Sequence, residues 1–156
     1  MNNSIWKSGQ KMNILSIGII FFIILESLNV LTLYFNPGSQ MGNGLGVFNA
    51  WEKSKTDLEM HQFVRYLVYW VAGTKLIFIS LLSVILMTAA ESTKLLTTVA
   101  MIGSISSFYW RLYPIIRSLD EEGYITPPGY SKTLGIMIAG FIGLFAIVLA
   151  WSLITT

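Results

Sequence analysis

Three ionisable side chains lie within stretches of the chain that are otherwise apolar: Glu26, Lys75 and Arg111. A charge near the centre of a membrane-spanning helix costs about 2.5 kcal/mol or more, so such residues usually pair with one another or mark a functional site. Counted from the expected helix ends nearest the longer loops, at about 1.5 Å per residue, all three lie roughly 12–18 Å deep. The sequence therefore predicts one polar layer in which Glu26 forms an ion pair with Lys75, Arg111 or both.

Arg111 belongs to a stripe of small and polar residues that repeats at helical spacing. Such a stripe is too polar for contact with lipid, so we expect it to face the interior of a helix bundle. Pro114, within the stripe, lacks a backbone amide and leaves the carbonyl of Trp110 as a further acceptor. On the first expected helix, Asn29 lies three positions after Glu26 and so shares its helical face. The members of the stripe are Thr97, Ala100, Ser104, Ser107, Arg111, Pro114 and Ser118.

The expected polar layer carries more positive than negative charge. One acid faces two bases, and Arg65 adds another cation near the mouth. A cavity with this balance attracts a carboxylate, phosphate, sulfonate or electron-rich carbonyl group. The aromatic residues nearby fit either a belt at headgroup level or the wall of a pocket for a flat or lipid-like ligand. The candidate ligand-binding residues are Glu26, Asn29, Arg65, Tyr69, Lys75, Ser107, Trp110 and Arg111.

The elements that must position these residues are apolar helices. The chain has 156 residues, of which 54% are hydrophobic and 12% charged, about half the charge of a typical soluble domain. Four segments have the roughly 20 apolar residues that a membrane span needs, over about 13–35, 63–88, 93–119 and 132–155. We expect one domain over residues 1–156, an all-α integral membrane four-helix bundle that crosses the cell membrane several times.

The connections between these segments set the topology. Ala89-Ala90-Glu91 is so short that the second and third segments must form an antiparallel hairpin, which places loops 36–62 and 120–131 together on the opposite face. Thr56-Asp57-Leu58-Glu59 fits a capping box, so the second helix should begin before its apolar part. Val47, Phe48 and Trp51 predict either a short interfacial segment on the membrane surface or an amphipathic entry to that helix.

Orientation in the membrane stays open because basic residues flank both faces. The long-loop face has Lys53, Lys55, Arg65, Arg117 and Lys132, and the other face has Lys7, Lys11 and Lys94.

Small residues form a stripe on the last segment: Gly135, Ala139, Gly143, Ala146 and Ala150. Such a surface lets another helix approach closely, either inside the bundle or between protomers of a homo-oligomer or larger membrane complex.

Several function classes are excluded or unsupported. The chain has no Cys and one His, and its net charge of +2 is too small to indicate nucleic acid. Without Cys, and without clustered carboxylates near the single His61, no metal site is expected. The sequence indicates no cofactor, and we find no arrangement of nucleophile, base or paired carboxylates that would support an enzyme.

The overall pattern resembles the DoxX-like group of small four-helix membrane proteins. The shared features are a long first connection, a second span that opens with Arg65 and carries Gly73, a tight hairpin, and a third span that ends in Arg117-Ser118 before Gly123. The resemblance covers topology over most of the chain. It implies a membrane subunit, sometimes linked to quinone or thiol redox chemistry in partner complexes, and it assigns no catalytic residue.

Three functions are compatible with these residues. The first is a membrane protein that binds an amphipathic or anionic small molecule or lipid between its helices, alone or within a larger complex. The second is a structural or accessory subunit whose polar layer only fixes helix pairing. The third is a transporter or proton-conducting element, which the lack of an internal repeat disfavours.

Overall fold

The computed structural model of the protein describes residues 13–155, and this part of the chain is helical without a β-strand. Lys7 and Lys11, counted above for orientation, lie outside the described residues. The elements in chain order are α1 (Ile14–Phe35), the 3-10 helix η1 (Leu45–Val47), α2 (Asn49–Ser54), α3 (Leu58–Thr88), α4 (Glu91–Ser106), α5 (Phe108–Glu121) and α6 (Tyr130–Thr155).

Three of these helices, α1, α3 and α6, are long and apolar enough to cross a membrane. The predicted span 93–119 is instead divided between α4 and α5, which meet at Ser107. The hydroxyls of Ser106 and Ser107 donate to the carbonyls of Ile102 and Ser104, at 2.7 and 2.6 Å, and such bonds compete with the helical ladder. Ser107 nevertheless keeps right-handed helical angles, so α4 and α5 continue in nearly one direction.

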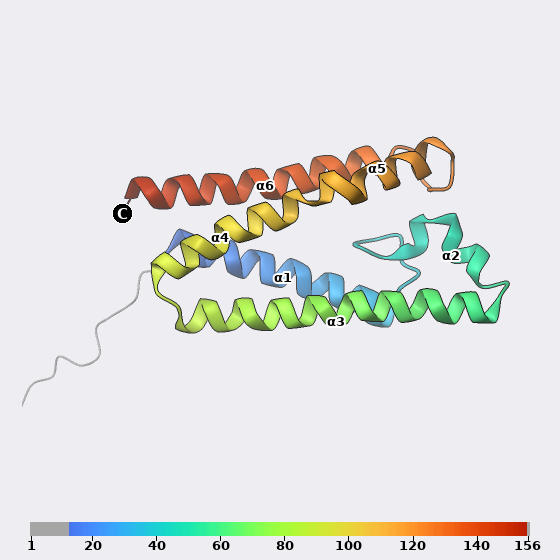
Figure 1. The fold of residues 1–156 in the computed structure, drawn as a ribbon, viewed down its shortest axis with the longest axis horizontal. Coiled ribbons are helices and arrows are strands. Elements are labelled where there is room, and N and C mark those ends of the chain that lie inside the picture. The colour runs from blue at the N-terminus through green and yellow to red at the C-terminus, as the bar shows by residue number, and fades with distance from the viewer. Residues whose placement is uncertain (1–12, 156) are drawn as a thin grey trace, which may run out of the picture.

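The long helices run back and forth along one axis, as Figure 1 shows. The hairpin between α3 and α4, the start of α1 and the end of α6 lie at one end, and both long loops lie at the other. α1 packs mainly on α3, whereas α6 contacts α1, α4 and α5. Among the described helices, α5 has its close backbone contacts with α4 and α6. Toward the long loops, α5 and α6 are joined to the rest of the molecule through the loops themselves.

α3 begins well before its apolar part, as the capping pattern predicts. Its first residue is Leu58, and the Asp57 carboxylate accepts a hydrogen bond from the Met60 amide at 3.1 Å. Asp57, rather than Thr56, is therefore the N-cap, and the first turns of α3 extend beyond the segment 63–88.

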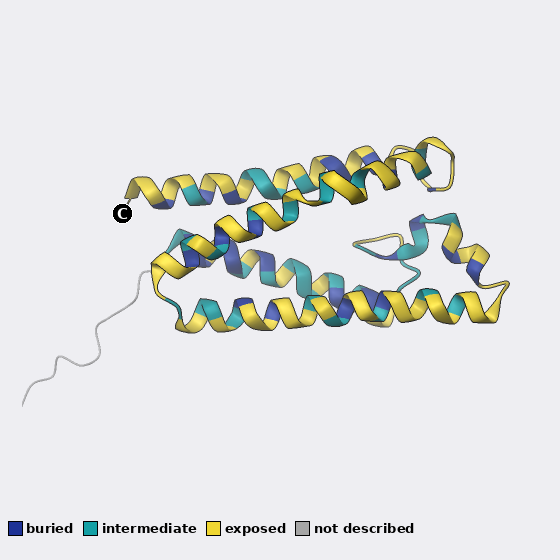
Figure 2. Ribbon diagram, in the orientation of Figure 1, coloured by how far each residue is buried: buried dark blue, intermediate teal, exposed yellow. Residues whose placement is uncertain are grey.

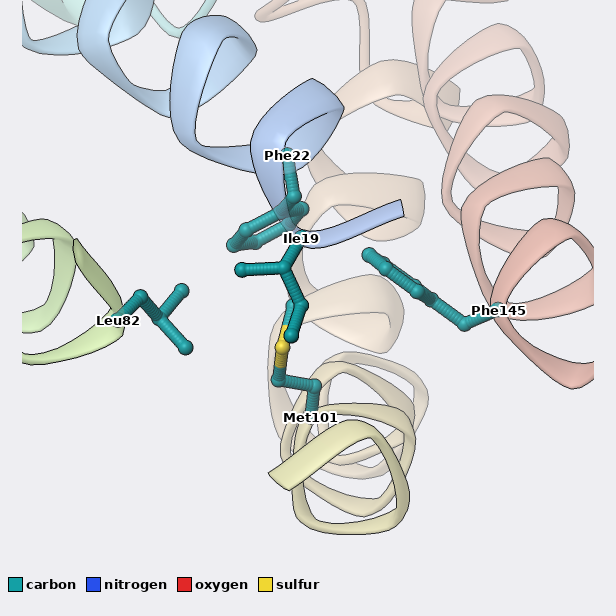
Figure 3. Close-up of a cluster of buried hydrophobic side chains, with 5 residues drawn as sticks. All are labelled: Ile19, Phe22, Leu82, Met101 and Phe145. Carbon is teal, nitrogen blue, oxygen red and sulfur yellow. The ribbon is translucent and has the colours of Figure 1, made fainter. Parts of the chain in front are cut away.

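A shared core lies toward the hairpin end, where α1, α3, α4 and α6 meet. It consists of Ile19, Phe22, Leu82, Met101 and Phe145 (Figure 3). The rings of Phe22 and Phe145 pack edge to face, with their centroids 5.5 Å apart. Elsewhere the surfaces of the long helices are largely exposed (Figure 2) and carry many large apolar side chains. Exposed apolar area on this scale marks surfaces that contact lipid or other proteins.

The two long loops form a cap with its own small core, built from Val47, Ile116, Ile125 and Leu134. Backbone bonds join the loops, because Thr126 donates to the Val47 carbonyl at 2.8 Å and Asn49 donates to the Tyr124 carbonyl at 2.9 Å. The prediction that these connections lie together is confirmed.

The predicted interfacial segment has two of its apolar side chains turned toward the protein. Val47 and Trp51 are only 1% and 6% exposed, and Val47 belongs to the small core of the cap. The Trp51 indole lies against Gly38, where a β-carbon would be 2.6 Å from the indole nitrogen. The short helix α2 is separate from α3, so these residues are not the entry to the second long helix. A position of this segment on the membrane surface stays a prediction.

Candidate functional site

An ion pair joins α1 to α3 near the middle of both helices. The Lys75 ammonium donates a hydrogen bond to Glu26 Oε2. The Glu26 side chain is 16% exposed and that of Lys75 is 24% exposed, so neither charge is fully covered by protein. The predicted pairing of Glu26 with Lys75 is confirmed.

A cleft of about 360 Å³ lies beside this pair, between α1, α3 and α4. This volume is at the small end of the range for ligand pockets. The walls are mostly apolar, and the ion pair and one hydroxyl supply the polar groups. The lining residues are Phe22, Glu26, Lys75, Phe78, Met101, Ser104 and Ile105. The cleft therefore borders the shared core on one side and a charged pair on the other.

Arg111 lies apart from this pair. Measured from the hairpin end at 1.5 Å per residue, Glu26 and Lys75 are both roughly 20 Å along their helices, whereas Arg111 is about 30 Å along α4 and α5. No carboxylate among the described residues lies within 4.0 Å of the guanidinium. The predicted single layer is thus wrong for Arg111, because the helix ends used as depth marks do not lie at one level.

The stripe around Arg111 is exposed rather than packed against another helix, so the prediction that it lines the bundle interior holds only at Ser104, which borders the cleft. Ala100, Ser104, Ser107, Arg111, Pro114 and Ser118 are all exposed. The opposite, aromatic face of α5 makes the contact with α6 instead. Tyr109 donates a hydrogen bond to the Gly135 carbonyl at 2.6 Å, and a β-carbon on Gly135 would lie 2.8 Å from the Tyr113 ring. The missing side chain of Gly135 thus leaves the space that the Tyr113 ring of α5 occupies.

The other candidates lie away from the cleft. The Arg65 guanidinium donates to the Tyr69 hydroxyl at 2.9 Å, and the Tyr69 ring stacks on Tyr34. Asn29 lies beside the loop at Gly42, where a β-carbon would be 3.0 Å from its Oδ1. Trp110 is 74% exposed. Of the eight candidates, therefore, Glu26 and Lys75 line the cleft.

Five lining residues are absent from the eight candidates, although the sequence carries a signal for three of them. Phe22 precedes Glu26 by about one turn, and Phe78 follows Lys75 by about one turn, so each shares a face with its charged neighbour. Ser104 belongs to the polar stripe that was expected to face the bundle interior. The contributions of Met101 and Ile105 depend on how α4 is rotated against α1, which local spacing does not determine.

A second polar cluster ties α1 to α4 at the hairpin end. Lys94 is 7% exposed, and its ammonium donates to Ser16 Oγ at 3.2 Å and to Glu91 Oε1 at 3.1 Å. Asn13 donates to the other oxygen of Glu91. Because each of these groups has a partner, the cluster is explained as a structural connection. The sequence suggested only that Lys94 flanks the membrane.

Asp120 connects the end of α5 to the start of α6. Its carboxylate accepts bonds from the Gly129 amide at 2.9 Å, from the Ser131 amide at 2.8 Å and from Ser131 Oγ at 2.6 Å. The hydrogen bonds from Ser131, the side-chain one above all, lower the pKa of Asp120 below its ordinary value. A carboxylate at a helix N-terminus is favourable, so this contact fixes the second long loop.

Residues 13–155 contain no group of three His, Cys, Asp or Glu side chains able to hold a metal ion. His61 instead packs on Trp51, with Nδ1 2.9 Å from Ser54 Oγ.

Comparison with known proteins found no matching family model, no matching curated protein and no matching solved structure.

Proposed function

We propose that this protein is a multi-pass membrane protein that binds one amphipathic molecule, such as a lipid, in the cleft between α1, α3 and α4. The observation that carries the proposal is the juxtaposition of an apolar cleft with the Glu26–Lys75 pair. An apolar pocket with a few convergent polar groups is the usual form of a small-molecule site.

The proposal includes a fourth membrane pass formed by α4 and α5 together. At 1.5 Å per residue the two helices extend for about 45 Å, longer than the roughly 30 Å hydrocarbon core. They run beside α6 from the hairpin end to the long-loop end (Figure 1). In this arrangement the protein is a four-helix bundle in the cell membrane, and its exposed apolar surfaces contact lipid.

Association with a second copy or a larger complex is a further part of this proposal. In α6 a β-carbon on Gly140 or Gly143 would meet no heavy atom of the described chain within 4 Å, and Ala139 is exposed. This face therefore has room for a helix of another protomer. The space beside Gly135, in contrast, is filled by the Tyr113 ring of the same chain.

A structural subunit is the main alternative, because a neutral ion pair can serve only to hold α1 against α3. The two functions differ in what the cleft contains. If the ion pair only holds the two helices together, the purified protein should retain no lipid in the cleft. If the cleft is a binding site, the protein should retain a molecule there and stay folded when that molecule is removed.

The test is native mass spectrometry of the full chain from mild detergent with added phospholipid. Ser104→Trp should fill the cleft, because Ser104 lines it and is exposed, and should lower lipid occupancy by about tenfold, equivalent to about 1.4 kcal/mol of lost contact. The matched control is Ser106→Trp, because Ser106 is also exposed on α4 but does not line the cleft.

Equal lipid occupancy in the two tryptophan variants would contradict the proposal. Absence of any retained lipid from the wild-type protein would favour the structural subunit.

A further inference from the structure

Arg111 is a cation whose charge the protein leaves unbalanced. Its guanidinium lies 5.1 Å from the centroid of the exposed Trp110 ring, and no described carboxylate is within 4.0 Å. Acids that could neutralise it are engaged elsewhere, since Glu26 pairs with Lys75 and Glu121 pairs with Arg117. An arginine within a helical segment that crosses a membrane needs an anion or access to water.

The face that carries Arg111 continues directly from the cleft. Ser104 lines the cleft, and Arg111 follows it by seven positions, which is about two helical turns or roughly 10 Å. The junction at Ser107 keeps helical angles, so Ser104 and Arg111 remain on one face. Both are exposed, on the side of α4 and α5 that does not pack on α6.

We propose that Arg111 binds the anionic headgroup of a membrane phospholipid whose hydrocarbon chain occupies the cleft. This inference rests on the proposed function and adds the chemical class of the ligand. The lipid lies along α4 and α5, with its phosphate toward the long loops and its chain in the cleft, against the wall formed by the packed rings of Phe22 and Phe78.

The chemistry of the site favours a lipid phosphate. The planar guanidinium binds phosphate oxygens in a bidentate manner. Arg111 precedes the end of α5 at Glu121 by about 15 Å, and a long arginine side chain can extend its charge further toward the interface. Trp110, which is 74% exposed, is the residue type that collects at headgroup level. The same face therefore offers a cation for the headgroup and an apolar cleft for the chain.

The test compares two phospholipids with identical acyl chains, phosphatidylglycerol and phosphatidylcholine, added to the full-length protein in detergent and followed by native mass spectrometry. The wild type should retain phosphatidylglycerol about tenfold more strongly, because a hydrogen-bonded charge pair contributes about this factor. Arg111→Met should remove the preference by weakening phosphatidylglycerol binding, and it should lower phosphatidylcholine binding much less, because the choline cation already balances the charge of that lipid's phosphate. Arg111→Lys should keep part of it.

The matched control is Arg117→Met, which removes an exposed arginine of the same helix that already pairs with Glu121. Its lipid preference should equal that of the wild type. A preference that persists in Arg111→Met, or that disappears equally in Arg117→Met, overturns the assignment to Arg111. Equal retention of the two phospholipids by the wild type, together with binding of inorganic phosphate that Arg111→Met abolishes, would assign Arg111 to a soluble anion and would also overturn it.

The Ser104→Trp variant separates this inference from the proposed function. Loss of both lipids in that variant, together with an unchanged headgroup preference in Arg111→Met, means that the cleft binds lipid and the headgroup assignment fails. Retention of both lipids at wild-type levels in Ser104→Trp means that the cleft itself is not the site.

Discussion

Replacing Glu26 by Gln tests the ion pair between α1 and α3 most directly. The substitution keeps the shape of the side chain but leaves the Lys75 ammonium without its carboxylate. Removing one partner of a buried pair typically costs 3–5 kcal/mol. Because the two side chains retain 16% and 24% exposure beside an open cleft, we expect the low end of that range, about 3 kcal/mol.

The second variant combines Glu26→Gln with Lys75→Met, which removes both charges and retains an apolar side chain of similar length. Replacement of a buried ion pair by apolar groups is often close to neutral. The double variant should therefore recover about 2 kcal/mol of the stability lost in the single variant, within the usual range for coupled neighbours.

Reversible unfolding in mixed micelles, titrated with sodium dodecyl sulfate and followed by helical circular dichroism, gives these free energies. Glu52→Gln is the matched control, because Glu52 pairs with Lys55 on the surface, where both side chains are about half exposed or more. Its effect should stay within about 1 kcal/mol. A double variant no more stable than Glu26→Gln would refute the reasoning, since the carboxylate would then stabilise the fold without its lysine.

Three further results are expected. Gly135→Leu should destabilise the protein by about 1–3 kcal/mol, because its β-carbon would lie 2.8 Å from an aromatic ring of α5; Gly143→Leu should leave monomer stability unchanged in the same unfolding assay and reduce only oligomer size by light scattering. Asp120→Asn should lower the stability of the start of α6 at neutral pH. The wild type should lose its extra stability over this variant as pH falls below about 4, since the folded pKa of Asp120 is lowered. Identical unfolding curves of the wild type and Asp120→Asn at pH 7 would contradict this expectation. Single cysteines at Ala90 and Gly123, introduced into a chain without Cys, should be labelled from opposite faces of the membrane in intact cells. Labelling of both from the same face would contradict the arrangement with four membrane-spanning segments.

Local composition was sufficient to predict the helical class and the direction of the chain. Three of the expected spans are helices of the right length and hydropathy, because a run of apolar residues bounded by breakers has few other stable forms in a membrane. The short hairpin at Ala89-Ala90-Glu91 also required the two long loops to lie at one end, and they are joined there by backbone hydrogen bonds.

The pairing of Glu26 with Lys75 was accessible from sequence for a related reason. An isolated charge on an apolar helix is costly, so opposite charges at similar depth on neighbouring helices predict an ion pair. Depth could be estimated for α1 and α3 because both helices are regular through their apolar parts. The same estimate failed for Arg111, because the helix ends at the long loops, from which depth was counted, do not lie at one level.

Only the tertiary structure decided which helical faces meet. Sequence spacing places Ser104, Ser107 and Arg111 on one face but does not say whether that face packs inward. At the contact between α5 and α6, Gly135 leaves the space that the Tyr113 ring occupies. The cleft also depends on tertiary packing, because α1, α3 and α4 meet at the shared core and α4 diverges beyond it from α1 and α3, which stay together. Packing of this kind depends on how the volumes of side chains far apart in the chain fit together, and the local periodicity of the sequence does not determine that fit.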